Sequence, residues 1–148
     1  MTEISYKNEV PDPVEYLELF ETTGWNSKYR VDSVELSHAL ANSWYLVVAY
    51  DGDQLVGVGR VVSDGVLYGM IYDMIVRPSH QGKGVGSTIL RMLVEECKSA
   101  GLRDIQLFSA SGKTSFYLNR GFVERPEDAP GMRLKVNDQR TRASNLTY

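Results

Sequence analysis

The fold is decided by the stretch Gln81-Gly82-Lys83-Gly84-Val85-Gly86-Ser87-Thr88. It follows a β-rich run from Val66 to Val76, which Pro78 ends. Apolar residues then recur at three- and four-residue spacing, and Gly101 supplies a C-cap. The pattern therefore predicts a strand that turns directly into the main helix, over about residues 84 to 100.

The same stretch has the composition of an anion site. A helix start presents unpaired backbone N–H groups and the positive end of the helix dipole. Its three glycines let a ligand approach the backbone, Lys83 adds a positive charge, and Ser87 and Thr88 add hydroxyl donors. We therefore expect a phosphate or pyrophosphate here. The alternative is a glycine-rich turn that holds no ligand.

Two other phosphate motifs fit less well. A P-loop needs Ser or Thr directly after Gly82-Lys83, and Gly84 stands there instead. A dinucleotide turn needs G-x-G-x-x-G, whereas the glycines here are spaced G-x-G-x-G. A nucleotide-binding oxidoreductase is therefore the weaker interpretation.

The segments before the turn predict a strand, two helices and a meander. Glu3–Lys7 alternates like a short strand, one helix begins at Pro13 and runs to Gly24, and a second begins with Asp32 or Ser33 as its N-cap. Residues 24–30 are expected to be a loop. Residues 44–62 alternate as a hairpin around Asp51-Gly52-Asp53, so three antiparallel strands lead to the turn.

The segments after the main helix predict a crossover and a short end. Asp104–Phe108 is a strand that a right-handed crossover would place parallel to its neighbour. Ser115–Arg120 predicts a short helix, and Phe122-Val123 and Met132–Val136 predict two last strands. The polar tail, about residues 137–148, is expected to be flexible.

Composition limits the class of protein. With 148 residues, 43% of them hydrophobic, residues 1–148 are expected to form a single domain. A net charge of −3 disfavours general nucleic-acid binding. One cysteine and two histidines supply neither an internal disulfide nor a Cys/His metal site, so no metal is expected. The polar N-terminus indicates neither export nor a membrane, which favours the cytoplasm.

Two motifs resemble one family. The pattern Q-x-x-G-x-G after Asp73-Met74-Ile75-Val76-Arg77-Pro78 resembles the acetyl-CoA motif of the GNAT N-acetyltransferases, and the segment Phe116–Phe122 is similar to the family's F-Y-x-x-x-G-F. The order of predicted elements agrees as well. The resemblance implies a mixed α/β sheet, with an antiparallel meander, a strand–helix–strand crossover and helices on both faces. It also implies acetyl-CoA as the cosubstrate.

The resemblance assigns the coenzyme to two segments. It implies that the backbone of Met74, Ile75 and Val76 pairs with the pantetheine arm as an added strand would. It places the pyrophosphate among Gln81, Gly82, Lys83, Gly84, Val85, Gly86 and Ser87. The family often has an Asn shortly before the Phe-Tyr pair, where this chain has Ser109-Ala110-Ser111-Gly112-Lys113.

The resemblance also implies two catalytic residues for direct attack of an amine on the thioester. Tyr117 would protonate the departing thiolate, since a phenol with a pKa of about 10 carries its proton at neutral pH. Asp73 would take the amine's proton, directly or through water. The alternatives are a packed aromatic ring for Tyr117 and a carboxylate that accepts structural hydrogen bonds for Asp73.

In the family that this chain resembles, the first two helices and their loop border the acceptor pocket, which makes Trp25, Tyr29 and Glu35 candidates for binding the acceptor. Aromatic rings and a carboxylate suit a cation, so we expect a small molecule with a primary amine as acceptor. Each of the three could equally serve packing or lie at the surface. A CoA-binding regulatory module without catalysis is the alternative from another functional class. The sequence is compatible with a homodimer.

Overall fold

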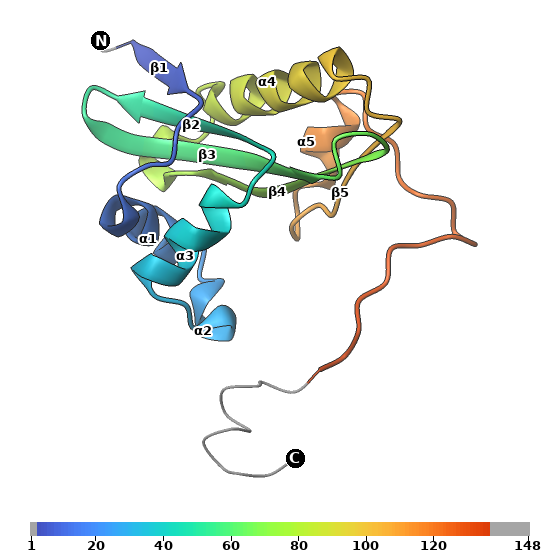
Figure 1. Ribbon diagram of the computed structural model, residues 1–148, viewed down its shortest axis with the longest axis horizontal. Coiled ribbons are helices and arrows are strands. Elements are labelled where there is room, and N and C mark those ends of the chain that lie inside the picture. The colour runs from blue at the N-terminus through green and yellow to red at the C-terminus, as the bar shows by residue number, and fades with distance from the viewer. Residues whose placement is uncertain (1–2, 137–148) are drawn as a thin grey trace. The chain divides into compact units, whose positions relative to one another are not determined.

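A computed structural model describes residues 3–136 (Figure 1). They fall into two compact units, one ending at Leu107 and one beginning at Phe108. The first unit holds one sheet in the order β1-β2-β3-β4-β5. Its strands are β1 (Ile4–Lys7), β2 (Tyr45–Asp51), β3 (Gln54–Ser63), β4 (Tyr68–Val76) and β5 (Asp104–Leu107). Its helices are α1 (Pro13–Glu21), α2 (Asn26–Tyr29), α3 (Ser33–Ala41), the short 3₁₀ helix η1 (Pro78–His80) and α4 (Val85–Ser99).

The topology confirms the predicted mixed sheet. Strands β1 to β4 pair with their neighbours in antiparallel fashion, and β5 pairs with β4 in parallel. Helix α4 is the crossover between β4 and β5. A parallel pair needs such a connection because the chain must return to the same end of the sheet.

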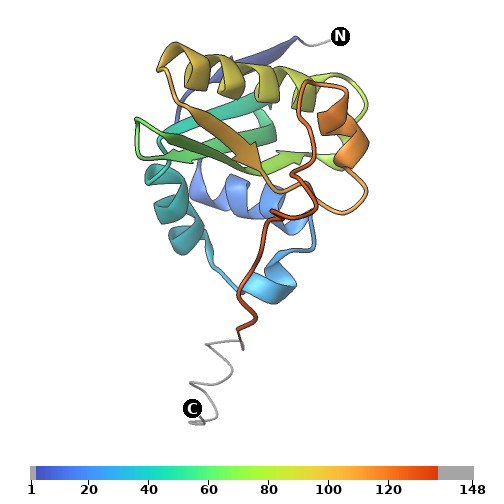
Figure 2. The same ribbon diagram turned by 90° about the vertical axis from the view of Figure 1, so that its right-hand side faces the viewer.

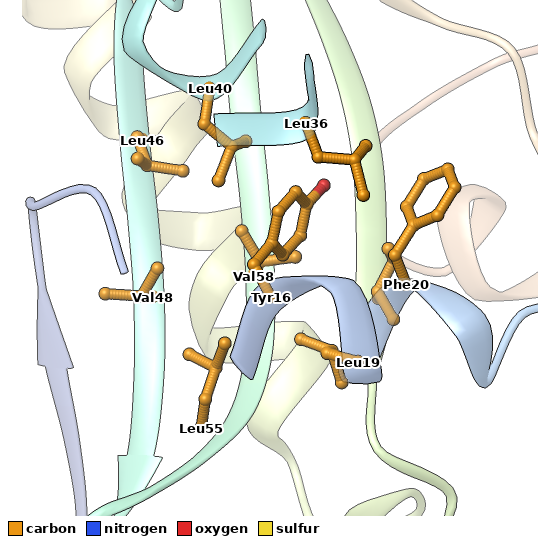
Figure 3. Close-up of a cluster of buried hydrophobic side chains, with 10 residues drawn as sticks. Tyr16, Leu19, Phe20, Leu36, Leu40, Leu46, Val48, Leu55 and Val58 are labelled. Carbon is orange, nitrogen blue, oxygen red and sulfur yellow. The ribbon is translucent and has the colours of Figure 1, made fainter. Parts of the chain in front are cut away.

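Helices cover both faces of the sheet, as predicted. Helices α1 and α3 lie on one face and α4 lies on the other (Figures 1 and 2). An apolar cluster fills the space beneath α1 and α3, with side chains from both helices and from β2, β3 and β4 (Figure 3). On the opposite face, Gly57 and Gly59 let α4 approach β3. A Cβ at Gly59 would lie 2.7 Å from Ile89 and 2.9 Å from Leu93.

Local signals explain where the helices begin. Asp12 caps α1 by accepting from the amides of Val14 and Glu15 at 3.1 Å. Asp32 caps α3 in a capping box with Glu35. The prediction of a loop over residues 24–30 is wrong, because α2 forms there. The Asn26 side chain stabilises this turn by pairing with both backbone groups of Val31, at 2.8 and 3.0 Å.

The second unit contains α5 (Thr114–Leu118) and, among the described residues, no strand. The prediction of strands at Phe122-Val123 and Met132–Val136 is therefore wrong. Val123, Met132 and Leu134 are 80–87% exposed, so the alternating apolar residues meet no surface that would bury them. Alternation alone does not make a strand, since a strand needs a neighbour for its backbone. The predicted tail at 137–148 lies outside the described residues.

Within residues 3–136, no helix is long and apolar enough to span a membrane.

Among residues 3–136, one buried side-chain polar atom has no hydrogen-bond partner. Tyr16 of α1 is 1% exposed, and its hydroxyl makes no hydrogen bond with any described residue. Figure 3 shows the hydroxyl among the apolar side chains. The pKa of Tyr16 is raised, mainly because the side chain is buried and also because of the negative charge of Asp73. The positive charge of Arg60 lowers the pKa by a smaller amount. The buried hydroxyl therefore lowers the free energy of unfolding, whereas the packed ring of Tyr16 raises it.

We expect Tyr16→Phe to raise the free energy of unfolding by about 1 kcal/mol, because it removes a buried group that is not hydrogen-bonded. For a chain of this length the melting temperature should rise by roughly 2–4 °C. The wild-type protein should also lose stability above pH 10.0, where the unfolded tyrosine ionises and the buried one does not. Denaturant unfolding from pH 7 to 11 measures both effects. Tyr68→Phe, at a ring 54% exposed, is the control. Lower stability of Tyr16→Phe at pH 7 would contradict this expectation.

Candidate functional site

A bulge interrupts the pairing of β3 and β4. Val58 pairs with Ile75 and Arg60 pairs with Tyr72, so Gly59 alone lies opposite both Asp73 and Met74. Asp73 has a backbone φ of 55°, in the left-handed region. An extra residue in a left-handed conformation bends a strand and increases its twist. The bulge thus changes the direction of β4 from Asp73 onward.

Strands β4 and β5 are paired over only part of β4. The parallel pairing joins Tyr68–Ile71 to Asp104–Leu107, where β5 ends. Residues 72–76 of β4 have no strand partner on that side among the described residues. A strand edge without a partner presents backbone N–H and C=O groups that can pair with an extended ligand. Met74, Ile75 and Val76 all lie on this open segment.

A tight turn follows β4 and leads to α4. The amide of Arg77 donates to the carbonyl of Val56 at 2.7 Å, which holds the end of β4 against β3. The 3₁₀ helix η1 comes next, and the Gln81 side chain donates back to the Val76 carbonyl at 3.0 Å. The side chain of Gln81 therefore closes the turn on the strand, and Gly82 follows with a φ of 76°.

The first turn of α4 is open and carries no acidic residue. Gly84 is the N-cap, with a φ of 85° and no side-chain cap, and the first intrahelical bond runs from the Thr88 amide to the Gly84 carbonyl at 3.0 Å. The amides of Val85 and Gly86 precede that bond, so they have no partner within the helix. A Cβ built at Gly82 or Gly84 would meet nothing within 4 Å. The unpaired amides, the absence of a blocking side chain and the nearby Lys83 together give this turn the features of an anion site.

His80 holds this turn to the end of the β2–β3 hairpin. Its Nε2 lies 2.9 Å from Oδ2 of Asp51, and its Nδ1 lies 2.8 Å from the hydroxyl oxygen of Ser79. The His80 side chain is only 13% exposed, so it is largely buried at this contact. Periodicity could not reveal this contact, because Asp51 lies 29 residues away in the chain.

Asp73 is held by an ion pair. Its Oδ2 accepts from Nε of Arg60 at 2.7 Å, and the two side chains are 23% and 17% exposed. Oδ1 makes no hydrogen bond with any described residue. One carboxylate oxygen is thus fixed by a cation, and the other is available to a proton or a ligand. Sequence reasoning selected Asp73 but missed Arg60.

Of the three residues expected on the acceptor side, Trp25 and Tyr29 share a neighbour. The Phe20 ring lies 6.0 Å from the Trp25 ring and 6.4 Å from the Tyr29 ring. Tyr29 is 54% exposed, and the Lys28 ammonium lies 5.6 Å from its centroid. The Glu35 carboxylate accepts from the Asp32 amide at 3.1 Å within the capping box of α3. Trp25 and Tyr29 are therefore brought close to each other through Phe20, whereas Glu35 takes part in the capping of α3.

In the second unit, Tyr117 lies on α5 between two rings. The centroids of Phe116 and Phe122 are 5.1 and 5.8 Å away, both edge to face. The amide of Phe122 donates to the Tyr117 carbonyl at 3.2 Å. Burial raises the pKa of Tyr117 above its ordinary value of 10.0. Its hydroxyl therefore keeps its proton at neutral pH.

Among residues 3–136, no group of three or more His, Cys, Asp or Glu side chains could hold a metal ion.

Comparison with known proteins identifies the family. The model of the acetyltransferase (GNAT) domain matches residues 42–124. The chain belongs to the GNAT acetyltransferase family. An uncharacterized N-acetyltransferase ycf52 of Pyropia yezoensis is 30% identical over 119 residues, which cover 78% of this chain and 67% of that protein. A chloroplastic GCN5-related N-acetyltransferase of Arabidopsis thaliana is 30% identical over 134 residues, covering 77% and 51% respectively.

Solved structures agree with this assignment. A GNAT-family acetyltransferase from Streptococcus pneumoniae has a TM-score of 0.73 and 26% identity, covering 93% of this chain and all of that one. The GNAT chain described here is therefore an acyltransferase, and members of its family use acetyl-CoA. The matched residues 42–124 include the bulge, the glycine turn and Tyr117.

Gly84→Ala should weaken CoA binding by roughly tenfold, because alanine resists the left-handed φ of 85° at the N-cap and would change the direction of the amides. Gly101→Ala is the matched control, since Gly101 follows the other end of α4 with a φ of 74° and nothing within 4 Å. Both variants should lose about 1 kcal/mol of stability. Only Gly84→Ala should lose affinity in calorimetry with CoA. Equal losses of affinity in both variants would mean that the turn is not the binding site.

Proposed function

We propose that this protein transfers the acetyl group of acetyl-CoA to a primary amine of a small molecule. The observation that carries the proposal is the continuous path from the unpaired edge of β4, through the glycine turn, to the open start of α4. This path offers backbone pairing for an extended amide chain and an anion site beyond it. Pantetheine followed by a diphosphate has the same order of groups.

The described residues fit this coenzyme. Backbone groups of Met74, Ile75 and Val76 would hold the pantetheine arm. The turn would hold the diphosphate through Gln81, Gly82, Lys83, Gly84, Val85, Gly86 and Ser87. Gln81 would contribute through its backbone, because its side chain is committed to Val76. The coenzyme supplies a thioester, which an amine attacks directly.

The acceptor must reach the thioester as a free amine. A primary ammonium group has a pKa of about 10.4, so only about one molecule in 2,500 is deprotonated at pH 7. Asp73 is the candidate proton acceptor through Oδ1, directly or through water, since Arg60 occupies Oδ2. Tyr117 is the candidate donor to the departing sulfur, and its raised pKa keeps that proton available.

Two aromatic residues at the ends of α2, Trp25 and Tyr29, support the proposed acceptor class. The exposed Tyr29 ring and the half-buried Trp25 ring suit a cationic or aromatic amine. Glu35 contributes less to this proposal because it takes part in the capping box. A panel of small primary amines, lysine side chains and peptide N-termini, assayed for CoA release, tests the class. Activity on peptide N-termini alone would reject a small-molecule acceptor.

Two other functions make different predictions. A regulatory CoA-binding module would bind CoA without turnover on any amine, and a nucleotide-binding oxidoreductase would bind NADH instead. Calorimetry with acetyl-CoA and with NADH separates them, and we expect heat only from acetyl-CoA. The single-domain organisation, the cytoplasmic location and the homodimer stay predictions. The Arabidopsis relative named above is chloroplastic.

Tyr117→Phe should keep the ring contacts with Phe116 and Phe122 and lower kcat by about 100-fold or more, because it removes the donated proton. The KM for acetyl-CoA should stay within about threefold. Steady-state kinetics with the best amine of the panel measures both. Phe116→Leu is the control for ring packing, and its kcat should change much less. A Tyr117→Phe enzyme with wild-type kcat would remove Tyr117 from the mechanism.

A further inference from the structure

The backbone at Asp73 is in a conformation that its side chain disfavours. Asp73 and Arg30 are the two residues other than glycine with a positive φ between residues 3 and 136. The left-handed region disfavours an L-residue by roughly 5- to 30-fold, although Asp tolerates it better than most. Gly59 lies opposite on β3, where no larger residue fits beneath α4. A contact from outside the bulge can offset this cost and hold Asp73 in the left-handed conformation.

Arg60 has the contacts to do so. Besides its 2.7 Å bond to Asp73, its Nη1 lies 3.3 Å from the Ala39 carbonyl and 3.4 Å from the Ser43 hydroxyl oxygen. Its guanidinium lies 5.9 Å from the centroid of the Tyr72 ring, the residue just before the bulge. The cation thus reaches the last turn of α3, where helix carbonyls concentrate negative charge. It joins α3, β3 and β4 at the bulge.

We infer that Arg60 is a positioning residue for the coenzyme: it holds the left-handed turn at Asp73 and so keeps the edge of Met74–Val76 turned away from β5. This inference rests on the function proposed above, in which that edge pairs with pantetheine. This role requires no contact between Arg60 and either substrate. It acts through the backbone of Asp73, separately from any proton that the Asp73 carboxylate takes.

The inference separates backbone conformation from the charge of residue 73. Glycine adopts a positive φ at no steric cost, so Asp73→Gly keeps the bulge without the ion pair. Asp73→Ala loses the ion pair and resists the bulge as well. Asp73→Asn keeps much of the tolerance for the left-handed region and loses the charge. In coenzyme binding, loss of a catalytic base alone would leave the affinity unchanged, and loss of a purely stabilising ion pair would change it equally in all three variants.

Calorimetry with CoA, which needs no acceptor, is the test. We expect Asp73→Gly to keep its affinity within about twofold, and Asp73→Ala and Arg60→Met to lose roughly tenfold. Asp73→Asn should lie between Gly and Ala. Arg91→Met is the matched control, because Arg91 pairs with Glu95 on the exposed surface of α4, 3.2 Å away. It should bind as the wild type does. Equal affinity in the Gly and Ala variants would overturn the inference.

Hydrogen exchange of the free protein gives a second readout that does not depend on the coenzyme. Backbone amides of residues 72–77 should exchange roughly tenfold faster in Arg60→Met than in wild type, and at the wild-type rate in Arg91→Met. Unchanged exchange in Arg60→Met would overturn the inference. A wild-type protein that fails to bind CoA would instead reject the proposed function, while the exchange comparison would still decide the role of Arg60. If Arg60→Met does not fold, the Gly and Ala variants of Asp73 carry the test.

Discussion

Strand β4 has one more residue than β3 between their two paired segments, and this extra residue redirects the chain that follows it. Before the bulge, β4 runs parallel to β5 and shares its hydrogen bonds with it. After the bulge, the backbone of Met74–Val76 has no strand partner on that side within residues 3–136. The open edge, the turn and the start of α4 then follow one another without a break. Each part of the proposed coenzyme site therefore depends on the bend at Asp73.

The two faces of the sheet contribute differently to this bend. On the α4 face, Gly57 and Gly59 bring the helix close to β3 and leave no room for a side chain at either of these two β3 positions. On the face of α1 and α3, Arg60 and Asp73 form an ion pair beside an otherwise apolar cluster. Burying an ion pair costs desolvation energy, so apolar packing alone would be an easier way to gain stability. A role in fixing backbone geometry explains why the pair is there.

The sequence predicted most of the fold because its signals are local. Pro13, Asp32 and the glycines at 82 and 84 each specify a helix end through contacts within a few residues. The hairpin turn and the main helix follow from periodicity in the same way. Family resemblance supplied the open edge of β4 and the choice of Tyr117, neither of which composition or spacing could give.

The sequence did not reveal contacts between residues that are distant along the chain, and it wrongly predicted strand pairing that does not form among the described residues. The ion pair of Arg60 with Asp73 and the contact of His80 with Asp51 join separate strands and turns, so no periodic pattern marks them. Helix α2 depends on one side chain, Asn26, that pairs with the Val31 backbone. Residues 132–136 have the alternating apolar pattern of a strand, yet within the part of the chain that the structure describes their apolar side chains are exposed. An alternating apolar pattern favours an extended strand, but the strand forms only where a neighbouring strand can pair with its backbone.

A crystal structure of the protein with acetyl-CoA tests the central claim most directly. The account predicts diphosphate oxygens about 3 Å from the backbone amides at the start of α4. It also predicts pantetheine amides bonded to the backbone of Met74–Val76, with Asp73 still in the left-handed region. A coenzyme bound elsewhere, or a β4 edge closed onto β5 in the complex, would contradict it.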